Sequence, residues 1–208
     1  MKRNIKRSAI KRKSEILDTA SDLFQTKGYE QTTMQDVMDA LDIAKGTIYH
    51  YFDSKEALFE AVIKNIVDAN IAQMKSLLDQ THGTALEKIQ ILAAAGDMTA
   101  NNENVLDHLN RPGNDIIHIR LLAATLVKQA PLYAKLIQQG CDEGIFKTNN
   151  PLECAEFMLS GVQFLTDLGI YPWTQADLER RALAFPRLIE QMLQAPINSF
   201  VFLTQKLK

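Results

Sequence analysis

Apolar residues recur at three- and four-residue spacings along most of the chain, which is the pattern of amphipathic helices. The first stripe begins after Ser14 and consists of Ile16, Leu17, Ala20, Leu23 and Phe24. Gly28 follows it and suits a left-handed helix end. The pattern predicts a helix that ends near Gly28.

Two shorter stripes follow directly. The hydroxyls of Thr32 and Thr33 suit an N-cap, with Gln35 and Asp36 at the reciprocal positions, ahead of a two-turn helix. Another short helix is predicted from Ala44 to Tyr49, before the chain is recapped at 52–54. Three short helices within about forty residues predict a compact N-terminal head.

The rest of the chain carries longer stripes. We predict a long connecting helix from Lys55 to about Gln80, and a second helix that the Thr84–Glu87 capping box begins. The pattern also predicts a short helix at 102–109, a turn at 111–114, and a helix from Asp115 that bends or restarts at Pro131 and closes at Gly144. Helices capped by Asn150 and by Thr174 follow, the latter kinked at Pro186, while 199–208 has no assignment.

Composition agrees with an all-α fold, because the chain of 208 residues has only 9 Gly and 6 Pro and is 46% hydrophobic. No apolar run approaches a membrane span and no signal peptide is apparent, so we expect a cytoplasmic protein. Cys141 and Cys154 match no disulfide framework or metal motif and are expected to be buried free thiols. Neither a metal nor a cofactor is expected.

The net charge of −2 hides an uneven distribution. Residues 1–55 contain ten Lys/Arg and eight Asp/Glu, whereas the rest of the chain contains 13 and 17. Seven of the basic residues lie within the first thirteen positions. A cluster of this kind suits contact with phosphates, although a short charged run is more often a solvated tail.

The third predicted helix has a distinctive outward face. If Ile43, Ile48 and Phe52 are buried, the helical period leaves the other side chains facing outward as a mixture of donors, a bare backbone point and an aromatic ring. These outward residues are Lys45, Gly46, Thr47, Tyr49 and His50. In a helix-turn-helix the second helix of the pair presents such a face to the major groove of DNA.

Residues 16–58 resemble the DNA-binding head of the TetR family. The matching positions are Ile16, Leu17, Ala20, Leu23, Phe24, Gly28–Tyr29, Thr32–Thr33, Val37, Ile43, Lys45–Tyr49, Tyr51–Phe52, Ser54–Glu56 and Leu58. The turn departs from the family pattern, since Leu41 and Asp42 replace a small residue and a glycine, and Ala44 replaces a capping Ser. Asp tolerates the left-handed conformation, so the turn can still form.

The resemblance implies specific roles for residues of the head. Thr33 and Lys55, at the starts of two helices, would touch phosphates. Lys45, Gly46, Thr47, Tyr49 and His50 would contact bases and the nearby backbone, and the basic segment from Lys2 to Lys13 would add phosphate or minor-groove contacts. Tyr49 also fits a packing role, while Tyr51 and Phe52 are expected in the core of the head.

The resemblance implies a second domain as well. We place a DNA-binding domain with a basic arm at 1–53, and a helical regulatory domain at 54–208 that dimerises through its last two long helices, where Gly161 permits close approach. The dimer would bind a palindromic operator, and a small organic ligand would release it. Candidate pocket residues, each also suited to core or surface, are Met74, Leu78, His108, His118, Leu122, Phe157, Phe164 and Trp173.

The residues also bear on two other functions. The chain contains no nucleophile elbow, glycine-rich phosphate loop or metal box, so an enzyme is not expected. A ligand-blind DNA-binding protein, or an activator of the same fold, remains the alternative to a repressor that responds to a ligand. Release from DNA by a ligand would distinguish these.

Overall fold

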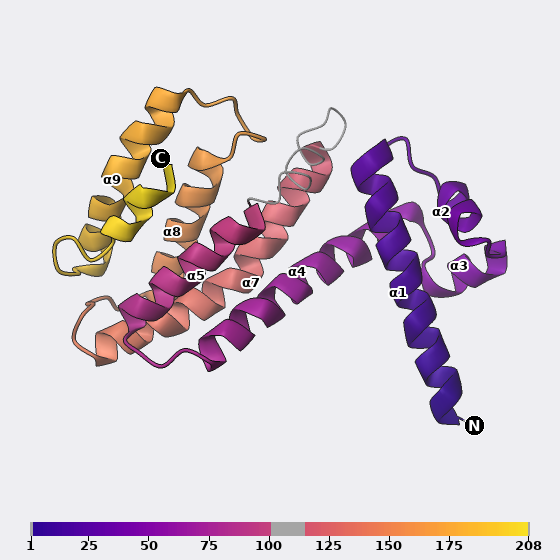
Figure 1. Cartoon of the computed structure of the whole chain (residues 1–208), viewed down its shortest axis with the longest axis horizontal. Coiled ribbons are helices and arrows are strands. Elements are labelled where there is room, and N and C mark those ends of the chain that lie inside the picture. The colour runs from indigo at the N-terminus through magenta and orange to yellow at the C-terminus, as the bar shows by residue number, and fades with distance from the viewer. Residues whose placement is uncertain (1, 101–114, 208) are drawn as a thin grey trace. The chain divides into compact units, whose positions relative to one another are not determined.

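The computed structural model describes residues 2–100 and 115–207, which form helices and connecting loops without a β-strand (Figure 1). The predicted all-α class is therefore confirmed. The α-helices are α1 (Lys2–Lys27), α2 (Met34–Leu41), α3 (Lys45–Tyr51), α4 (Lys55–Asp79), α5 (Ala85–Ala100), α7 (Asp115–Asp142), α8 (Pro151–Thr166) and α9 (Gln175–Leu193), and a 3-10 helix, η1 (Val201–Leu207), follows them. The short helix and turn predicted at 102–114 lie outside the described residues.

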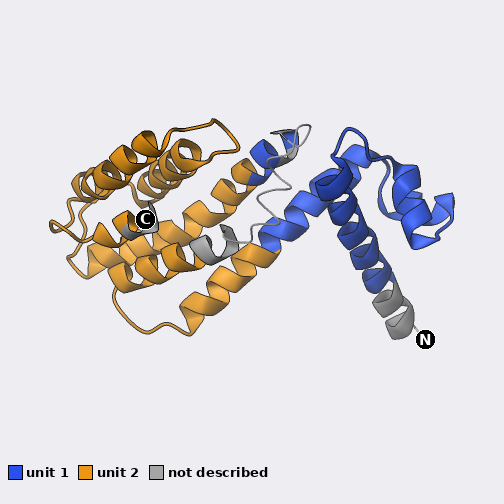
Figure 2. Cartoon of the chain, turned by 45° about the horizontal axis from the view of Figure 1, so that its top comes forward, with its two compact units in different colours: residues 1–68, 104–121 blue, residues 69–103, 122–208 orange. Residues whose placement is uncertain are grey.

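The chain divides into two compact units, comprising residues 1–68 with 104–121, and residues 69–103 with 122–208 (Figure 2). Helices α4 and α7 have residues in both units. The predicted division at 53/54 separates the head from the regulatory domain by function and stays a prediction.

In the first unit, α1 packs against α2, and the core between the short helices is apolar. Ile16, Phe24 and Ile48 are completely or almost completely buried. Phe24 also contacts Phe59 of α4 edge to face, with ring centroids 5.6 Å apart. Such a pair adds directional packing to the area that it buries, so it helps to hold the first turns of α4 against α1.

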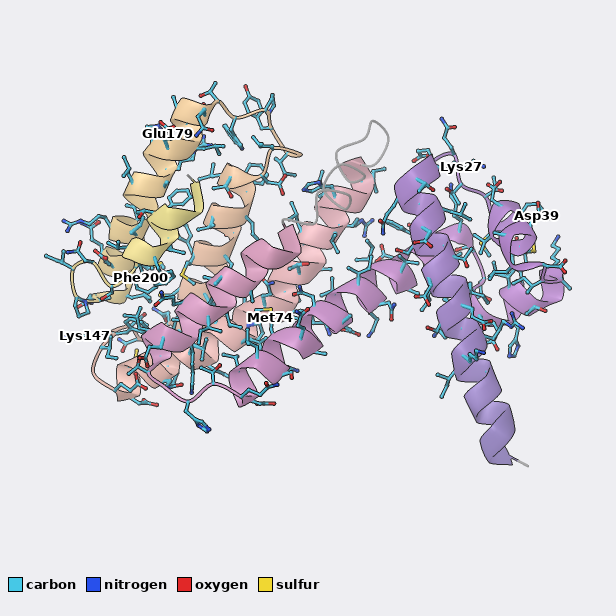
Figure 3. All side chains as sticks on the ribbon, in the orientation of Figure 1. Lys27, Asp39, Met74, Lys147, Glu179 and Phe200 are labelled. Atoms are coloured by element: carbon cyan, nitrogen blue, oxygen red, sulfur yellow. The ribbon has the colours of Figure 1, made fainter. Side chains whose placement is uncertain are left out.

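In the second unit, polar contacts tie α5 to the C-terminal end of α7 and to Glu143, which follows that helix. Lys88 Nζ donates to Gln139 Oε1 at 3.1 Å, and the amide of Ala85, at the start of α5, donates to Glu143 Oε2 at 3.0 Å. Helices α8 and α9 pack against one another, and η1 packs on α9 and α5. Met74 on α4 and Phe200 ahead of η1 mark two buried positions of this unit (Figure 3).

Several helix boundaries differ from those predicted. Helix α1 begins at Lys2 and not at Ser14, because Lys and Arg are good helix formers and no Pro or Gly interrupts the segment. The basic segment is therefore part of a helix and not a separate extended arm. Helix α7 continues through Pro131 and is not restarted there. Because proline has no N–H, the carbonyl of Val127 loses its helical hydrogen bond. Both residues are exposed, so water can bind that carbonyl.

Three of the predicted helix caps are present and one is not. Thr33 with Asp36 and Thr174 with Asp177 form capping boxes, and Thr84 and Glu87 exchange the same bonds. Asn150 precedes α8 as predicted, but its side chain makes no capping bond. Its own amide instead donates to the hydroxyl of Thr148, which holds the backbone in a different conformation.

The C-terminal segment, which had no predicted assignment, contributes to the core of the second unit. Phe200 is fully buried and stacks near Phe146, with ring centroids 5.9 Å apart. Its amide donates to Oε1 of Glu190, a residue only 4% exposed. A buried carboxylate on α9 thus anchors the segment that carries η1.

Candidate functional site

Thr33 begins the second helix of the head through a complete capping box. Its hydroxyl accepts a hydrogen bond from the amide of Asp36 at 3.1 Å, and its own amide donates to Asp36 Oδ2 at 2.7 Å. Thr32 does not cap the helix; it is fully buried, and its hydroxyl donates to the carbonyl of Gly28 at 2.7 Å. The two threonines therefore have separate roles, and the exposed one stands at the start of α2.

Asp36 joins α1 to the start of α2. Lys27 Nζ lies 2.7 Å from Asp36 Oδ2. The bond from Lys27, together with the two from Thr33, lowers the pKa of Asp36 from 3.8 to about 2. The carboxylate therefore remains charged over nearly the whole acidic range and holds α1, the loop and α2 together.

This pKa predicts acid sensitivity of the head. A carboxylate whose pKa is lowered by folding stabilises the folded state above its unfolded value, and that contribution disappears as the pH falls from about 4 toward about 2. We expect Asp36→Asn to have a lower Tm than the native protein at pH 7, and the difference to shrink across that window. Thermal melting followed by circular dichroism measures both; Asp22→Asn, an exposed carboxylate on α1, is the control. A constant difference between pH 5 and pH 2 would contradict this assignment.

The turn between α2 and α3 has the conformation that Asp42 was predicted to permit. Asp42 has φ 50° and ψ 51°, the left-handed region, and its amide donates to the carbonyls of Asp39 and Met38. Ala44 at the N-cap of α3 makes no side-chain bond, as an alanine must. The turn is thus closed by backbone hydrogen bonds, and the Asp42 carboxylate is left exposed.

Helix α3 has one buried and one exposed face. Ile48 is fully buried and Phe52, just after the helix, is 5% exposed, which agrees with the predicted inner side. Tyr49 is 39% exposed, and Lys45, Gly46 and His50 are exposed as well. A Cβ atom built on Gly46 meets no atom within 4 Å. Packing within the described residues therefore does not require glycine here, and Gly46 leaves the outer surface of α3 flat.

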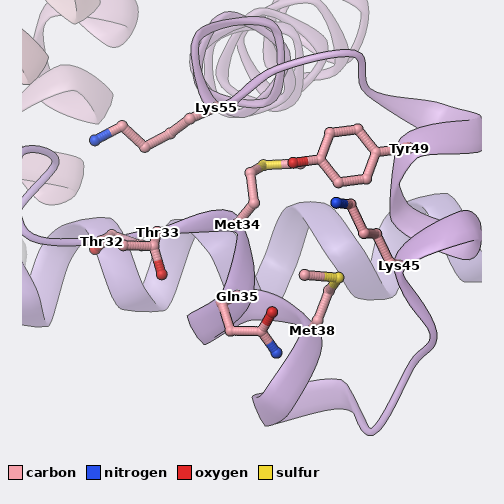
Figure 4. A pocket seen from close by; sticks show the side chains of 8 residues that line it. All are labelled: Thr32, Thr33, Met34, Gln35, Met38, Lys45, Tyr49 and Lys55. Atoms are coloured by element: carbon pink, nitrogen blue, oxygen red, sulfur yellow. The ribbon is translucent and has the colours of Figure 1, made fainter.

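Four of the seven residues predicted to contact DNA line one concavity of the head: Thr33, Lys45, Tyr49 and Lys55 (Figure 4). Lys45 Nζ lies over the ring of Tyr49, 5.7 Å from its centroid. Gly46, Thr47 and His50 lie on the same helix but do not line this hollow. The prediction did not include four further lining residues, whose place at the start of α2 or just before it was the available signal: Thr32, Met34, Gln35 and Met38.

Lys55 has a more internal position than predicted. Its ammonium group donates to the carbonyls of Tyr29 at 3.0 Å and Glu30 at 3.3 Å, and it lies 4.4 Å from the centroid of the Tyr29 ring. Figure 4 shows it directed away from Tyr49 and Lys45. Lys55 therefore ties the loop between α1 and α2 to the first turn of α4. Burial, followed by the charges of Glu56, Glu30 and Glu60, raises the pKa of Tyr29.

The candidate pocket residues differ in burial. Met74 and His118 are buried, Leu78, Leu122 and Trp173 are half-buried, and His108 lies outside the described residues. Phe157 and Phe164 are 76% and 55% exposed, on the outer side of α8. These two residues thus belong to a surface of the protomer and not to its interior.

Some features are absent from the residues that the structure describes. Between residues 2 and 100 and between 115 and 207, no three His, Cys, Asp or Glu side chains are grouped so that they would hold a metal ion. Over the same ranges, no helix is long and apolar enough to cross a membrane.

The short helices α2 and α3, the closed turn between them and the exposed polar face of α3 define a helix-turn-helix protein of the DNA-binding class. Comparisons with known proteins agree. Residues 16–62 match the family model "Bacterial regulatory proteins, tetR family", and residues 97–188 match "Tetracyclin repressor-like, C-terminal domain".

Individual relatives cover most of the chain. The transcriptional repressor KstR2 of Rhodococcus jostii (strain RHA1) is 40% identical over 197 residues, covering 90% of this chain and 93% of its own. The uncharacterised regulator YfiR of Bacillus subtilis (strain 168) is 26% identical over 200 residues, covering 89% and 93%. A TetR-family regulator from Mesorhizobium loti MAFF303099 has a similar solved structure, with a TM-score of 0.64, 21% identity, and coverage of 88% and 96%. The chain therefore belongs to the TetR family of bacterial regulatory proteins, and it binds DNA to regulate transcription.

Proposed function

We propose that this protein is a homodimeric transcriptional repressor in the cytoplasm, that it binds a palindromic operator through α3, and that a small organic molecule releases it. The observation that carries the proposal is the exposed surface of α3: Lys45, Gly46, Tyr49 and His50 face outward while Ile48 holds the helix in the core. The name of the Rhodococcus relative supports repression over activation.

The contacts proposed for the head follow from its geometry. Lys45 and Tyr49 place a cation and an aromatic hydroxyl of α3 at the concavity that Thr33 also lines, so a phosphate there would meet both of these donors. Gly46, Thr47 and His50 extend along α3 toward base edges. Lys55 supports this surface by holding the loop ahead of α2, and we propose that it positions the phosphate site in addition to adding charge to it.

The dimer is proposed from the outer faces of α8 and α9. Phe157, Phe164, Leu183 and Leu188 are each more than half exposed, although Leu, Phe and similar residues gain most from burial. A Cβ atom built on Gly161, on the same helix as the two phenylalanines, meets no atom within 4 Å. The protomer therefore leaves room at Gly161 for a second copy to approach, and a two-fold pair of such faces forms a four-helix interface.

Release by a ligand is proposed as a population shift. A ligand moves a DNA-binding equilibrium only by the difference between its affinities for the DNA-competent and incompetent states. The helical unit formed by residues 69–103 and 122–208 is the proposed sensor, and Met74 is the candidate pocket residue with the best support, because it is buried between helices.

The test is selection of bound duplexes from a random pool, followed by a salt titration of the selected duplex. We expect a two-fold symmetric motif, a steep fall in affinity with salt, and loss of binding in the Thr47→Ala/Tyr49→Ala variant. Recovery of no motif would overturn specific recognition. A motif with binding that no compound relieves would instead favour a ligand-blind regulator of the same fold, and stimulation of transcription from that site would favour an activator.

Asp42 gives a prediction within this proposal. Its carboxylate is exposed in the turn that precedes the reading helix, so it repels nearby phosphates. Asp42→Asn keeps a residue that tolerates the left-handed conformation and removes the charge. We expect operator affinity to rise by about 2- to 5-fold at low salt, with the gain shrinking as salt screens the charge. Fluorescence anisotropy measures the effect, and Asp79→Asn, at the far end of α4, is the control. Equal affinity for Asp42→Asn and native protein at low salt would show that this carboxylate lies far from the phosphates.

A further inference from the structure

A hollow of about 300 Å³ lies at the C-terminal end of α9 in the second unit, and we refer to it as the α9 hollow. It is lined by Arg187, Glu190, Gln191, Gln194, Ala195 and Ile197. Arg187 carries a positive charge and Glu190 a negative one, so two opposite charges share the wall of one hollow.

The carboxylate of Glu190 is buried but only half satisfied. The residue is 4% exposed, and its Oε1 accepts a hydrogen bond from the amide of Phe200 at 3.3 Å. Its Oε2 is buried as well and has no hydrogen-bond partner among the described residues. A carboxylate that is removed from water without a counter-charge is costly. A cationic donor from outside the protomer would therefore stabilise this oxygen.

Arg187 does not supply that donor within its own chain. Residues three positions apart on a helix are neighbours, and Arg187 and Glu190 have this spacing on α9. In the part of the chain that the structure describes, the exposed Arg187 nevertheless forms no ion pair, either with Glu190 or with another residue. The α9 hollow thus presents a cation and an anion that do not neutralise one another.

The two glutamines of the α9 hollow can move aside for an incoming group. Gln191 and Gln194 are exposed, and their side-chain amides form no hydrogen bond with a described residue. Exposed side chains of this length change rotamer within nanoseconds. A side chain that enters from outside can therefore displace them and reach the Glu190 carboxylate.

A second copy of the chain carries both of the charges that are needed. In a two-fold symmetric interface, residue i of one subunit contacts residue j of the other, and j contacts i. Leu183 lies on the same face of α9, because positions 183, 187, 190 and 194 are spaced by three or four residues, and it is 72% exposed. The apolar surface proposed for the dimer therefore continues into the α9 hollow.

We infer that the two subunits exchange Arg187 and Glu190 across the two-fold axis, and that these ion pairs restrict dimerisation to chains that carry both residues. Each guanidinium donates to Oε2 of Glu190 of the partner subunit. The inference rests on the dimer set out under Proposed function and names the residues that make it selective. A chain that lacks either residue would leave a charge unpaired in a mixed dimer, so the mixed dimer would be weaker.

The test mixes two variants of the full chain, Arg187→Glu and Glu190→Gln. Arg187→Glu brings two carboxylates together at both sites, so its homodimer should have a Kd at least about 100-fold above that of the native dimer. Glu190→Gln removes the charge but keeps an oxygen for the Phe200 amide, and its homodimer should be weakened by about 10-fold. In the mixture one chain supplies Glu190 and the other Arg187, so the heterodimer gains one ion pair and should be tighter than either homodimer.

Sedimentation equilibrium of each variant, and energy transfer between differently labelled chains in the mixture, measure these constants. Lys64→Glu is the control, because it reverses the charge of an exposed lysine of α4 that already pairs with Asp68 of its own chain. It should dimerise as the native protein does. Circular dichroism checks that all variants keep their helical content.

A statistical mixture of homodimers and heterodimers would overturn the inference and leave the proposed dimer standing. An Arg187→Glu chain that dimerises as tightly as the native protein would do the same. A native protein that is monomeric at micromolar concentration would contradict the dimer itself, and the inference with it.

Discussion

Phe157→Glu combined with Phe164→Glu should convert the protein into a folded monomer that no longer holds its operator. Both side chains are exposed in the protomer, at 76% and 55%, so the change removes little internal packing. In a two-fold interface it would bring four carboxylates into an apolar contact, where unpaired charges cost several kcal/mol. Because two linked heads bind more tightly than one by about 10² to 10⁴, operator affinity should fall by at least about 100-fold.

Sedimentation equilibrium and anisotropy on the selected duplex measure these two effects. Gly161→Trp provides an independent variant. The protomer has open space at that position, whereas a partner helix packed there would clash with the added side chain. Val127→Glu is the matched control: Val127 is 71% exposed and apolar but lies on α7, so the dimer should persist. A double-glutamate variant that remains dimeric at micromolar concentration would show that the subunits meet elsewhere.

Replacing Gly46 by a larger residue should weaken operator binding without lowering the stability of the protein. A side chain at this position meets no atom within 4 Å, and alanine favours a helix over glycine by about 1 kcal/mol. Gly46→Ala should therefore keep or raise the Tm. In the complex, the same atoms would separate α3 from the floor of the groove and misplace its polar contacts, each worth about 1–3 kcal/mol. Operator affinity should fall by about 10-fold for Gly46→Ala and further for Gly46→Leu.

Melting curves and operator titrations of the two Gly46 variants test this directly. The graded series separates a steric effect on DNA from damage to the head, because damage would lower the Tm as the side chain grows. Unchanged operator affinity in Gly46→Leu would mean that α3 enters the groove through another face.

The agreement between sequence and structure is closest where function depends on local chemistry. Capping boxes at Thr33 and Thr174, the left-handed Asp42 and the buried Ile48 all depend on residues within a few positions of one another, and the helical period supplies the rest. The family match at residues 16–62 confirms that the head was correctly recognised.

The sequence was less informative where a distant contact decided the outcome. The ammonium of Lys55 is bound by carbonyls about 25 positions away, and no local pattern reports that. Asn150 has a preferred capping side chain, yet Thr148 holds its backbone in another conformation. Phe157 and Phe164 were named as candidate pocket residues, but the apolar character of a side chain does not show what covers it.

Periodicity, caps and turn residues act over short distances, so they were enough to predict an all-helical protein, a helix-turn-helix near its N-terminus and the outward residues of the third helix. It is the packing of the helices that brings Thr33, Lys45, Tyr49 and Lys55 to one hollow and leaves Gly161 unobstructed. Such groupings depend on how helices pack, and packing is the sum of many weak contacts between residues far apart in the chain.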